Sequence, residues 1–256
     1  LEEIVVGETT LCVQYRMPPA LLEHPSRYFY DGLVVCADDS ESTGPEGFPW
    51  PVDGLPLAFV DVGGGDSEVI HGDSGGRSNP TEAELVVRIV SGFLAAGDVK
   101  PGSVAVLSPY SRQVDRIRSE LVERDIAHEV RVGTVDSFQG QETDAVVFSA
   151  VRSNPEGDLG FLRDPRRLCV ALTRARRGLV IAGDKRTLRK CHHWAALIDS
   201  CQERGCVLDA DKLQQAQEID DELVLALELP TGPIIPARKY GAAEGPLAFV
   251  LGYDPK

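Results

Sequence analysis

The chain has 256 residues, of which 43% are hydrophobic and 26% are charged, and its formal net charge is −14. This composition is typical of a globular protein, and the length suits one large domain. No segment approaches the run of about 18 apolar residues that a membrane-spanning helix needs. Six cysteines without regular spacing exclude a secreted disulfide framework, so we expect a reducing compartment, cytoplasmic or nuclear. The chain starts at Leu1 and has no basic signal-peptide region, which favours a fragment of a longer protein.

The charge is distributed unevenly along the chain. Residues 1–99 carry −13, residues 100–190 carry +5, and residues 191–256 carry −6. At contact range the local field outweighs the net charge of the whole protein. The basic middle segment is therefore a candidate for binding phosphate groups despite the acidic total.

Apolar runs alternate with amphipathic stretches in chain order. We predict strands over residues 57–61, 103–107, 129–132, 145–151 and 178–182, and helices over residues 81–96, 111–123, 165–175 and around Trp194–Ile198. Thr81 and Glu84 have capping-box spacing, and Gly97 ends that helix. Continuously apolar strands that alternate with helices predict an α/β fold, with a parallel sheet covered by helices on both faces.

Two segments interrupt this alternation. Residues 36–56 and 62–79 are rich in Gly, Pro, Asp and Ser and are predicted to be surface loops or partly disordered. We assign residues 1–208 to the α/β domain and residues 209–256 to a loop-rich C-terminal extension, with one candidate helix over 211–229.

An open parallel sheet binds its ligand at the carboxyl ends of its strands, which points to the segments after Leu107, Val132 and Val151. The loop over 132–142 offers small hydrogen-bonding residues to a phosphate. In the predicted helix that follows, Arg167 and Arg174 are seven residues apart and would lie on one side. From the residues alone, phosphate binding and a purely structural role both stay open.

Three segments together resemble the sequential motifs of superfamily 1 helicases: Gln14–Met17, Gly133–Glu142 and Arg166–Arg176. The resemblance is to the second RecA-like motor domain of the regulator-of-nonsense-transcripts and senataxin group, and it covers residues 9–208. Further segments occur in the same order, namely His24–Gly32, Leu107–Tyr110, Val151–Asn154 and Gly160–Leu162. Three long motifs in order are a much more specific signal than any one of them.

The resemblance implies an ATP-binding side made of Gln14, Tyr15, Arg16, Gln139, Gly140, Glu142 and Arg174. Tyr15 is similar to the aromatic residue that stacks on adenine, and Glu142 to the carboxylate that holds the ribose. Arg16 resembles the arginine that meets the γ-phosphate, and Arg174 the arginine finger. Gln139 and Gly140 resemble the phosphate-sensing part of the loop. Alternative structural roles are a core position for Tyr15, a helix-start carboxylate for Glu142, and surface ion pairs for Arg167 and Arg176.

The resemblance also implies a surface for single-stranded RNA or DNA, made of Pro109, Tyr110, Thr134, Arg152, Ser153 and Asn154. Such residues contact backbone phosphate and sugar, and therefore read no base sequence. RNA is favoured over DNA by analogy with the relatives that the motifs resemble.

The chain lacks a Gly-Lys dipeptide and an apolar strand ending in Asp-Glu, so the phosphate-binding loop and acidic Mg²⁺ ligands of a first motor domain are missing. We expect ATP with Mg²⁺ to bind between this domain and that first domain, and the segment alone to be inactive. The alternatives are a non-catalytic nucleic-acid-binding module from a truncated or degenerate helicase gene, and a subunit that completes the ATP site of another chain.

Two positions depart from the family pattern, and the chain carries no metal motif. Pro18 stands where the family usually has His, and Cys169 where Asn is usual. We expect no metal site in the chain itself, because the spacing of the candidate ligands fits no common zinc pairing; these are Cys191, His192, His193, Cys201 and Cys206.

Overall fold

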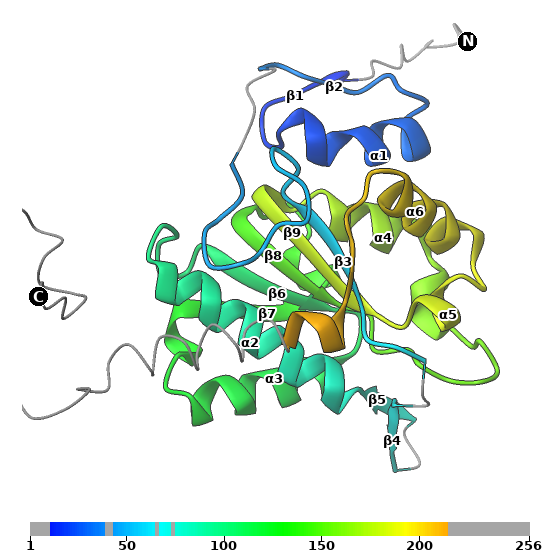
Figure 1. Cartoon of the computed structure of the whole chain (residues 1–256). Helices are drawn as coiled ribbons and strands as arrows, with labels where there is room; N and C mark the ends of the chain where they lie inside the picture. Colours follow the sequence, from blue (N-terminus) through cyan, green and yellow to red (C-terminus); the bar gives the residue numbers. More distant parts are fainter. Residues whose placement is uncertain (1–10, 39–42, 65–66, 73–74, 215–256) are drawn as a thin grey trace, which may run out of the picture. The chain divides into compact units, whose positions relative to one another are not determined.

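The computed structural model describes residues 11–38, 43–64, 67–72 and 75–214 (Figure 1). The chain divides into units 1–214 and 215–256, and the second lies outside the described residues. The first unit is built on a six-stranded sheet in which every neighbouring pair is parallel. In spatial order its strands are β10 (Val207–Asp209), β3 (Leu57–Asp61), β9 (Ala175–Gly183), β8 (Thr143–Ser149), β6 (Val104–Ser108) and β7 (Val130–Thr134). All five predicted strands are present, and β10 is an additional one.

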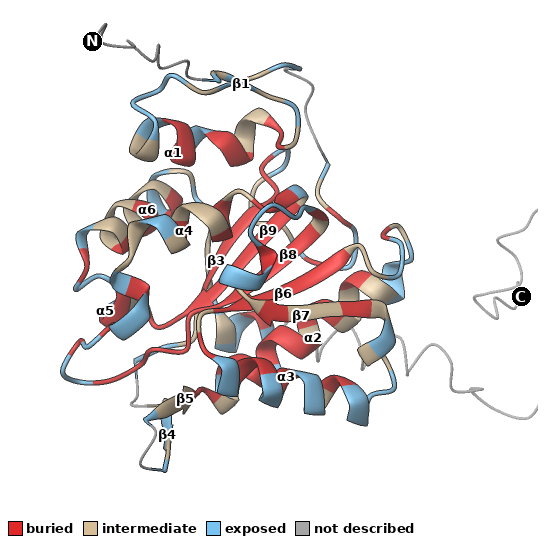
Figure 2. Cartoon of the chain, turned by 180° about the vertical axis from the view of Figure 1, so that it is seen from behind, coloured by how far each residue is buried: buried red, intermediate tan, exposed pale blue. Residues whose placement is uncertain are grey.

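Helices cover both faces of the sheet, which confirms the predicted α/β fold class (Figure 2). On one face lie α2 (Pro80–Ala96) and α3 (Ser111–Glu123); on the other lie α4 (Pro165–Leu172), α5 (Lys185–Leu188) and α6 (His192–Glu203). Alternate strand residues enter two separate cores: Val104 and Val106 pack with α2 and α3, whereas Ala105 and Leu107 pack with the opposite layer. The strands are continuously apolar because both of their faces are buried.

The cap of helix α2 lies two residues before its predicted position. The N-cap is Asn79 rather than Thr81, and the Asn79 side chain accepts a 3.1 Å hydrogen bond from the Glu82 backbone N–H. Pro80 occupies the first helical position, where its missing N–H costs nothing, so the capping residue must precede it. Gly97 ends the helix as predicted, with a φ of 76° in the left-handed region that glycine tolerates.

Several small elements were missed by the periodicity analysis. A parallel pair of two-residue strands, β1 (Val13–Gln14) and β2 (Val35–Cys36), flanks helix α1 (Pro19–Phe29). The segment 62–79, predicted as loop, contains an antiparallel hairpin of β4 (Val69–His71) and β5 (Gly76–Ser78). Three 3₁₀ turns complete the described elements, namely η1 (Ala127–Glu129), η2 (Asp136–Phe138) and η3 (Gly160–Arg163). Strands of two or three residues are too short to show a period.

The predicted helix over 165–175 is too long, because α4 ends at Leu172 and β9 begins at Ala175. The pairing of β9 with β8 explains the difference, since the Arg174 carbonyl already accepts a 3.1 Å hydrogen bond from the Thr143 N–H. Arg174 therefore lies in the turn between α4 and β9. The expectation that a single helix aims Arg167 and Arg174 to one side is wrong.

The first unit ends at Gln214, beyond residue 208, where the sequence places the end of the α/β domain. Strand β10 reaches Asp209, one residue beyond it, and residues 210–214 are helical. Asp209 Oδ1 accepts a 3.0 Å hydrogen bond from the Asp211 N–H at the start of that helical segment. The rest of the predicted helix over 211–229 lies outside the described residues. No helix among the described residues is long and apolar enough to cross a membrane.

Candidate nucleotide and nucleic-acid interfaces

The sheet separates the predicted site residues into two groups at opposite edges. Thr134 lies at the carboxyl end of β7, whereas Glu142 directly precedes the amino end of β8. The segment between them thus runs from one edge of the sheet to the other. Arg174 precedes the amino end of β9 and lies at the same edge as Glu142. The rule that placed the ligand site at the carboxyl ends therefore accounts for only one of the two groups.

At the amino-terminal edge Arg16 joins segments that are far apart in the chain. Arg16 Nε donates a 2.7 Å hydrogen bond to Glu142 Oε2, and its Nη1 donates one of 2.8 Å to the Thr173 carbonyl. Arg176 Nη1 lies 3.5 Å from the other oxygen of Glu142. The hydrogen bond from Arg16, together with the nearby arginine charges, lowers the pKa of Glu142. The carboxylate is therefore held ionised between two guanidinium groups.

Arg174 is a buried cation that has no carboxylate partner in the described part of the chain. The residue is 9% exposed, and its donors reach neutral oxygens: Val170 O at 2.9 Å, Gln141 O at 3.0 Å and Thr173 Oγ1 at 2.8 Å. Among the described residues no carboxylate lies within ion-pair distance of it. Burial first, and then the charge of Arg16, lower the pKa of Arg174. An anion that reached both guanidinium groups would relieve this unfavourable arrangement.

The segment before α1 presents Tyr15 to solvent. Tyr15 is 87% exposed, which excludes a core position for its ring. The Gln14 side chain orders this turn, because its Oε1 accepts 2.8 Å hydrogen bonds from the N–H groups of Arg16 and Met17. An open pocket of about 370 Å³ lies alongside. Its lining consists of Gln14, Tyr15, Arg16, Met17, Pro18, Ala37, Asp38 and Arg176.

The loop that leads to Glu142 is exposed at Gln139 and Gly140. Gly140 has a φ of 80°, a left-handed conformation that favours glycine. Arg131 anchors the end of the loop by donating a 2.9 Å hydrogen bond from Nη2 to the Glu142 carbonyl. Both residues therefore lie at the surface, in a loop whose end is held at the Arg16 edge.

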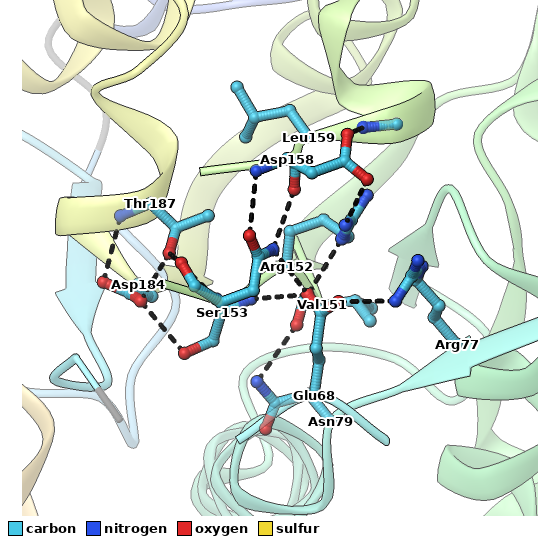
Figure 3. Close-up of polar contacts among 12 residues, drawn as sticks. Glu68, Arg77, Asn79, Val151, Arg152, Ser153, Asp158, Leu159, Asp184 and Thr187 are labelled. Atoms are coloured by element: carbon cyan, nitrogen blue, oxygen red, sulfur yellow. Dashed lines mark hydrogen bonds and ion pairs between the residues drawn. The ribbon is translucent and has the colours of Figure 1, made fainter. Parts of the chain in front are cut away.

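At the carboxyl-terminal edge Arg152 is brought to the predicted place but points inward (Figure 3). It is 2% exposed; Nε donates to Glu68 Oε2 at 2.8 Å, Nη2 to Asp158 Oδ2 at 2.9 Å, and Nη1 to the Tyr110 hydroxyl at 3.3 Å. Burial opposes the charge of Glu68, but hydrogen bonds from Arg152, Asn154 and the Ser153 N–H outweigh it and lower the pKa of Glu68. Each of the three guanidinium nitrogens of Arg152 therefore has a hydrogen-bond partner inside the fold.

Ser153 and Asn154 are also buried and directed inward. Ser153 Oγ donates a 2.9 Å hydrogen bond to Asp184 Oδ2. Asn154 Nδ2 donates to Glu68 Oε2 at 3.0 Å and to the Asp158 carbonyl at 2.8 Å. The sequence analysis missed all three acidic partners, because they lie in turns and loops between the predicted elements. The one sequence feature that could have pointed to these partners is that they are carboxylates near the ends of strands.

Val151 connects β8 to this loop in a strained conformation. Its φ of 73° is rare for a β-branched residue and favours glycine. Two contacts hold it: the Val151 N–H donates to Glu82 Oε2 at 2.8 Å, and Asn79 Nδ2 donates to the Val151 carbonyl at 3.1 Å. Glu82 is completely buried, and burial raises its pKa to about 8 despite the hydrogen bond from Ser149. The fold thus stores strain where β8 enters the predicted nucleic-acid surface.

The remaining predicted nucleic-acid residues lie at the same edge. Pro109 is half-buried and Tyr110 is 6% exposed; both follow β6. Thr134 is half-buried at the end of β7, and its Oγ1 accepts a 3.4 Å hydrogen bond from the Ser137 N–H. The structure brings all six residues to one edge, with Arg152, Ser153, Asn154 and Tyr110 beneath the surface.

The two departures from the family pattern both lie next to α1. The Pro18 carbonyl accepts hydrogen bonds from the Leu21 and Leu22 N–H groups and starts that helix. Cys169 Sγ lies 3.4 Å from the Tyr30 hydroxyl and connects α4 to the residue after α1. Within the described ranges, no three His, Cys, Asp or Glu side chains are gathered as metal ligands.

A parallel α/β sheet with helicase motifs ordered along its two edges defines a RecA-like domain of the helicase type. The chain belongs to the family described as AAA domain, which matches residues 3–186. It is 41% identical over 208 residues to the regulator of nonsense transcripts 1 homolog of Arabidopsis thaliana, covering 78% of this chain and 16% of that protein. It is 39% identical over 211 residues to the ATP-dependent helicase NAM7 of Saccharomyces cerevisiae, covering 79% and 21%. The domain is therefore a superfamily 1 helicase domain of the regulator-of-nonsense-transcripts type.

The chain spans about a fifth of the length of these relatives. Among solved structures, it is similar to a crystal structure of PRRSV nsp10 (helicase), with a TM-score of 0.33 and 15% identity. That similarity covers 74% of this chain and 30% of the viral protein.

Proposed function

We propose that this chain is the second motor domain of an ATP-dependent helicase or translocase that acts on single-stranded RNA. The observation that carries the proposal is the buried guanidinium group of Arg174, which lies near Arg16 and has no carboxylate partner among the described residues. Two arginines whose charges reinforce each other favour a highly charged anion such as the triphosphate of ATP. The names of the relatives, regulators of nonsense transcripts, support RNA as the substrate and a cytoplasmic or nuclear location.

In this proposal the amino-terminal edge of the sheet faces ATP. Arg174 acts as the arginine finger and Arg16 meets the γ-phosphate, so both stabilise the charge that develops during phosphoryl transfer. The exposed Tyr15 ring stacks on adenine beside the 370 Å³ pocket. Glu142 exchanges its hydrogen bond with Arg16 for the ribose hydroxyl groups, and Gln139, Gly140 and Gln14 complete the nucleotide contacts.

The missing parts of the ATP site come from a first motor domain. That domain supplies the phosphate-binding loop and the ligands of Mg²⁺, which this sequence lacks. The chain alone is therefore inactive as an ATPase. The carboxyl-terminal edge contacts the strand through Thr134 and Pro109. Tyr110 and the Arg152–Asn154 loop hold this surface in shape, and they contact the strand directly only if the loop opens.

The test is ATP hydrolysis by the longest natural product that contains this segment, with and without single-stranded RNA. We expect RNA-stimulated turnover, and its loss in Arg174→Ala and in Arg16→Ala. Arg166→Ala is the matched control, because Arg166 is 89% exposed and pairs only with Asp164 among the described residues. Turnover that survives both Arg174→Ala and Arg16→Ala would overturn the roles of these arginines.

The competing function is a non-catalytic nucleic-acid-binding module. It would show salt-sensitive RNA binding without turnover, since phosphate contacts make affinity fall steeply with salt. The buried Arg174 favours the motor, because a module that binds only RNA has no use for a buried cation at the opposite edge of the sheet. The absence of both turnover and binding would leave neither function standing.

A further inference from the structure

Phe161 is an exposed aromatic residue to which the proposed function gives no role. It lies in η3, immediately before α4, and is 57% exposed. Large aromatic side chains contribute to stability mainly by burial, so a Phe held at the surface forgoes that contribution. Its neighbour Tyr110 follows β6, and its neighbour Arg167 pairs with Asp136 after β7. The segments after these two strands are the ones assigned above to the nucleic acid.

Two side chains hold the Phe161 ring in place. The Arg167 guanidinium carbon lies 5.3 Å from the ring centroid, within range of a cation–π interaction. Arg167 itself is fixed by hydrogen bonds to both oxygens of Asp136, at 3.0 and 2.9 Å. On another side, the Tyr110 ring centroid lies 5.6 Å away at an interplanar angle of 52°. The ring is therefore positioned although the residue is 57% exposed.

The buried network beneath the ring explains why it can be so well placed. Arg152 donates to the Tyr110 hydroxyl and is itself held by Glu68 and Asp158. Gly160, with a φ of 47°, allows the backbone to pass close to Arg152 and Tyr110. A Cβ at this position would lie 2.7 Å from Arg152 Nη1 and 2.8 Å from the Tyr110 hydroxyl oxygen. The inward-pointing Arg152 thus supports an aromatic surface.

We propose that Phe161 is a stacking platform for a base of the bound single strand; this inference rests on the proposed function. A π-face accepts any base, which suits a motor that reads no sequence. Arg167 fixes the ring, while Asp136 balances its charge, so the ring itself provides the contact with the base. The occupant is therefore a nucleobase flanked by its phosphates, and the Arg152 network is its support.

The test measures binding of a fluorescein-labelled 15-nucleotide oligouridylate to the 256-residue chain by fluorescence anisotropy at low salt. We expect Phe161→Ala and Phe161→Leu to weaken binding by about tenfold or more, because both remove the π-face. Phe161→Trp retains the affinity, and its new indole fluorescence is quenched by the oligonucleotide. Val122→Ala is the control, since Val122 is 65% exposed in the last turn of α3, whereas Tyr110 caps the first turn.

Each outcome decides the inference. Equal affinity of Phe161→Ala and wild type would overturn the stacking role and leave the proposed function intact. Equal losses in the Ala, Leu and Trp variants would assign the residue a packing role instead. No salt-sensitive binding by the wild type would overturn both the inference and RNA binding by this chain. Thermal unfolding of each variant checks folding, and the Leu and Trp pair decides the matter if the Ala variant fails to fold.

Discussion

Arg16 and Glu142, 126 positions apart in the chain, meet at the amino-terminal edge of the sheet through a 2.7 Å hydrogen bond. Their side chains are 28% and 42% exposed, so solvent screens the pair. The contact brings the first and second helicase motifs together, and Arg174 of the third lies close enough for its pKa to respond to Arg16. The contact therefore defines the geometry of the edge proposed to face ATP and contributes little to stability.

The first prediction concerns this pair. Glu142→Ala changes the free energy of unfolding by less than about 1 kcal/mol, because exposed ion pairs contribute little. We expect it to raise the KM for ATP of the longest natural product, since the ribose would lose the carboxylate that is proposed to hold it. Urea denaturation and steady-state kinetics measure the two effects. A large loss of stability with an unchanged KM would contradict the assigned role.

The second prediction concerns the buried Arg152. Arg152→Met removes a charged side chain that is 2% exposed and leaves the buried Glu68 with Arg77 as its one ion-pair partner among the described residues. We expect a loss of about 3–5 kcal/mol in the free energy of unfolding, the usual cost of breaking a buried pair. The matched control is Arg77→Met, because Arg77 pairs with the same carboxylate but is 22% exposed. Similar losses in the two variants, measured by urea denaturation, would contradict the prediction.

The third prediction concerns the pH dependence set by Glu82. Its pKa is about 8 in the fold, against 4.5 for an ordinary Glu, so the folded chain binds one more proton than the unfolded chain between these values. The stability contributed by the protonated form is complete below about pH 4.5 and is lost as the pH rises through 8. This contribution is on the order of a few kcal/mol.

Glu82→Gln removes this titration. We therefore expect the melting temperature of the variant to depend less on pH between about 5 and 8 than that of the wild type. Thermal unfolding at several pH values, monitored by circular dichroism, makes the comparison. Parallel curves for the two proteins would show that Glu82 ionises normally in the fold.

The fourth prediction concerns Gly160. In Gly160→Ala the alanine must adopt a left-handed φ, and its Cβ lies closer than 3 Å to two polar atoms. We expect a loss of about 1–3 kcal/mol in the free energy of unfolding. Gly102→Ala is the control, because Gly102 has a φ of 77° but nothing within 4 Å of the position that a Cβ would take. Chemical denaturation should show the larger loss at Gly160. RNA affinity should fall only in that variant, since Tyr110 and Phe161 are displaced.

Much of the fold could be predicted because its signals are local. The centres of the two strands, Val104–Leu107 and Ala145–Phe148, are apolar and buried without interruption, which requires burial on both faces and hence a parallel sheet between helix layers. The end of α2 at Gly97 was also predictable, because a glycine that ends a helix is a local signal. The hairpin at residues 69–78 could not be predicted, because its strands are too short to show a period and part of it is exposed.

The sequence by itself determined the α/β class, the chain order of the motifs and which residues carry charge, because periodicity and residue chemistry are encoded locally. Only the tertiary structure decided where those charges point. Arg152 faces inward because Glu68, 84 positions away, reaches it through the hairpin segment. Arg174 stays buried without a carboxylate among the described residues because the pairing of β8 with β9 places it there. Ion pairs and burial depend on distance in space, which local sequence patterns do not contain.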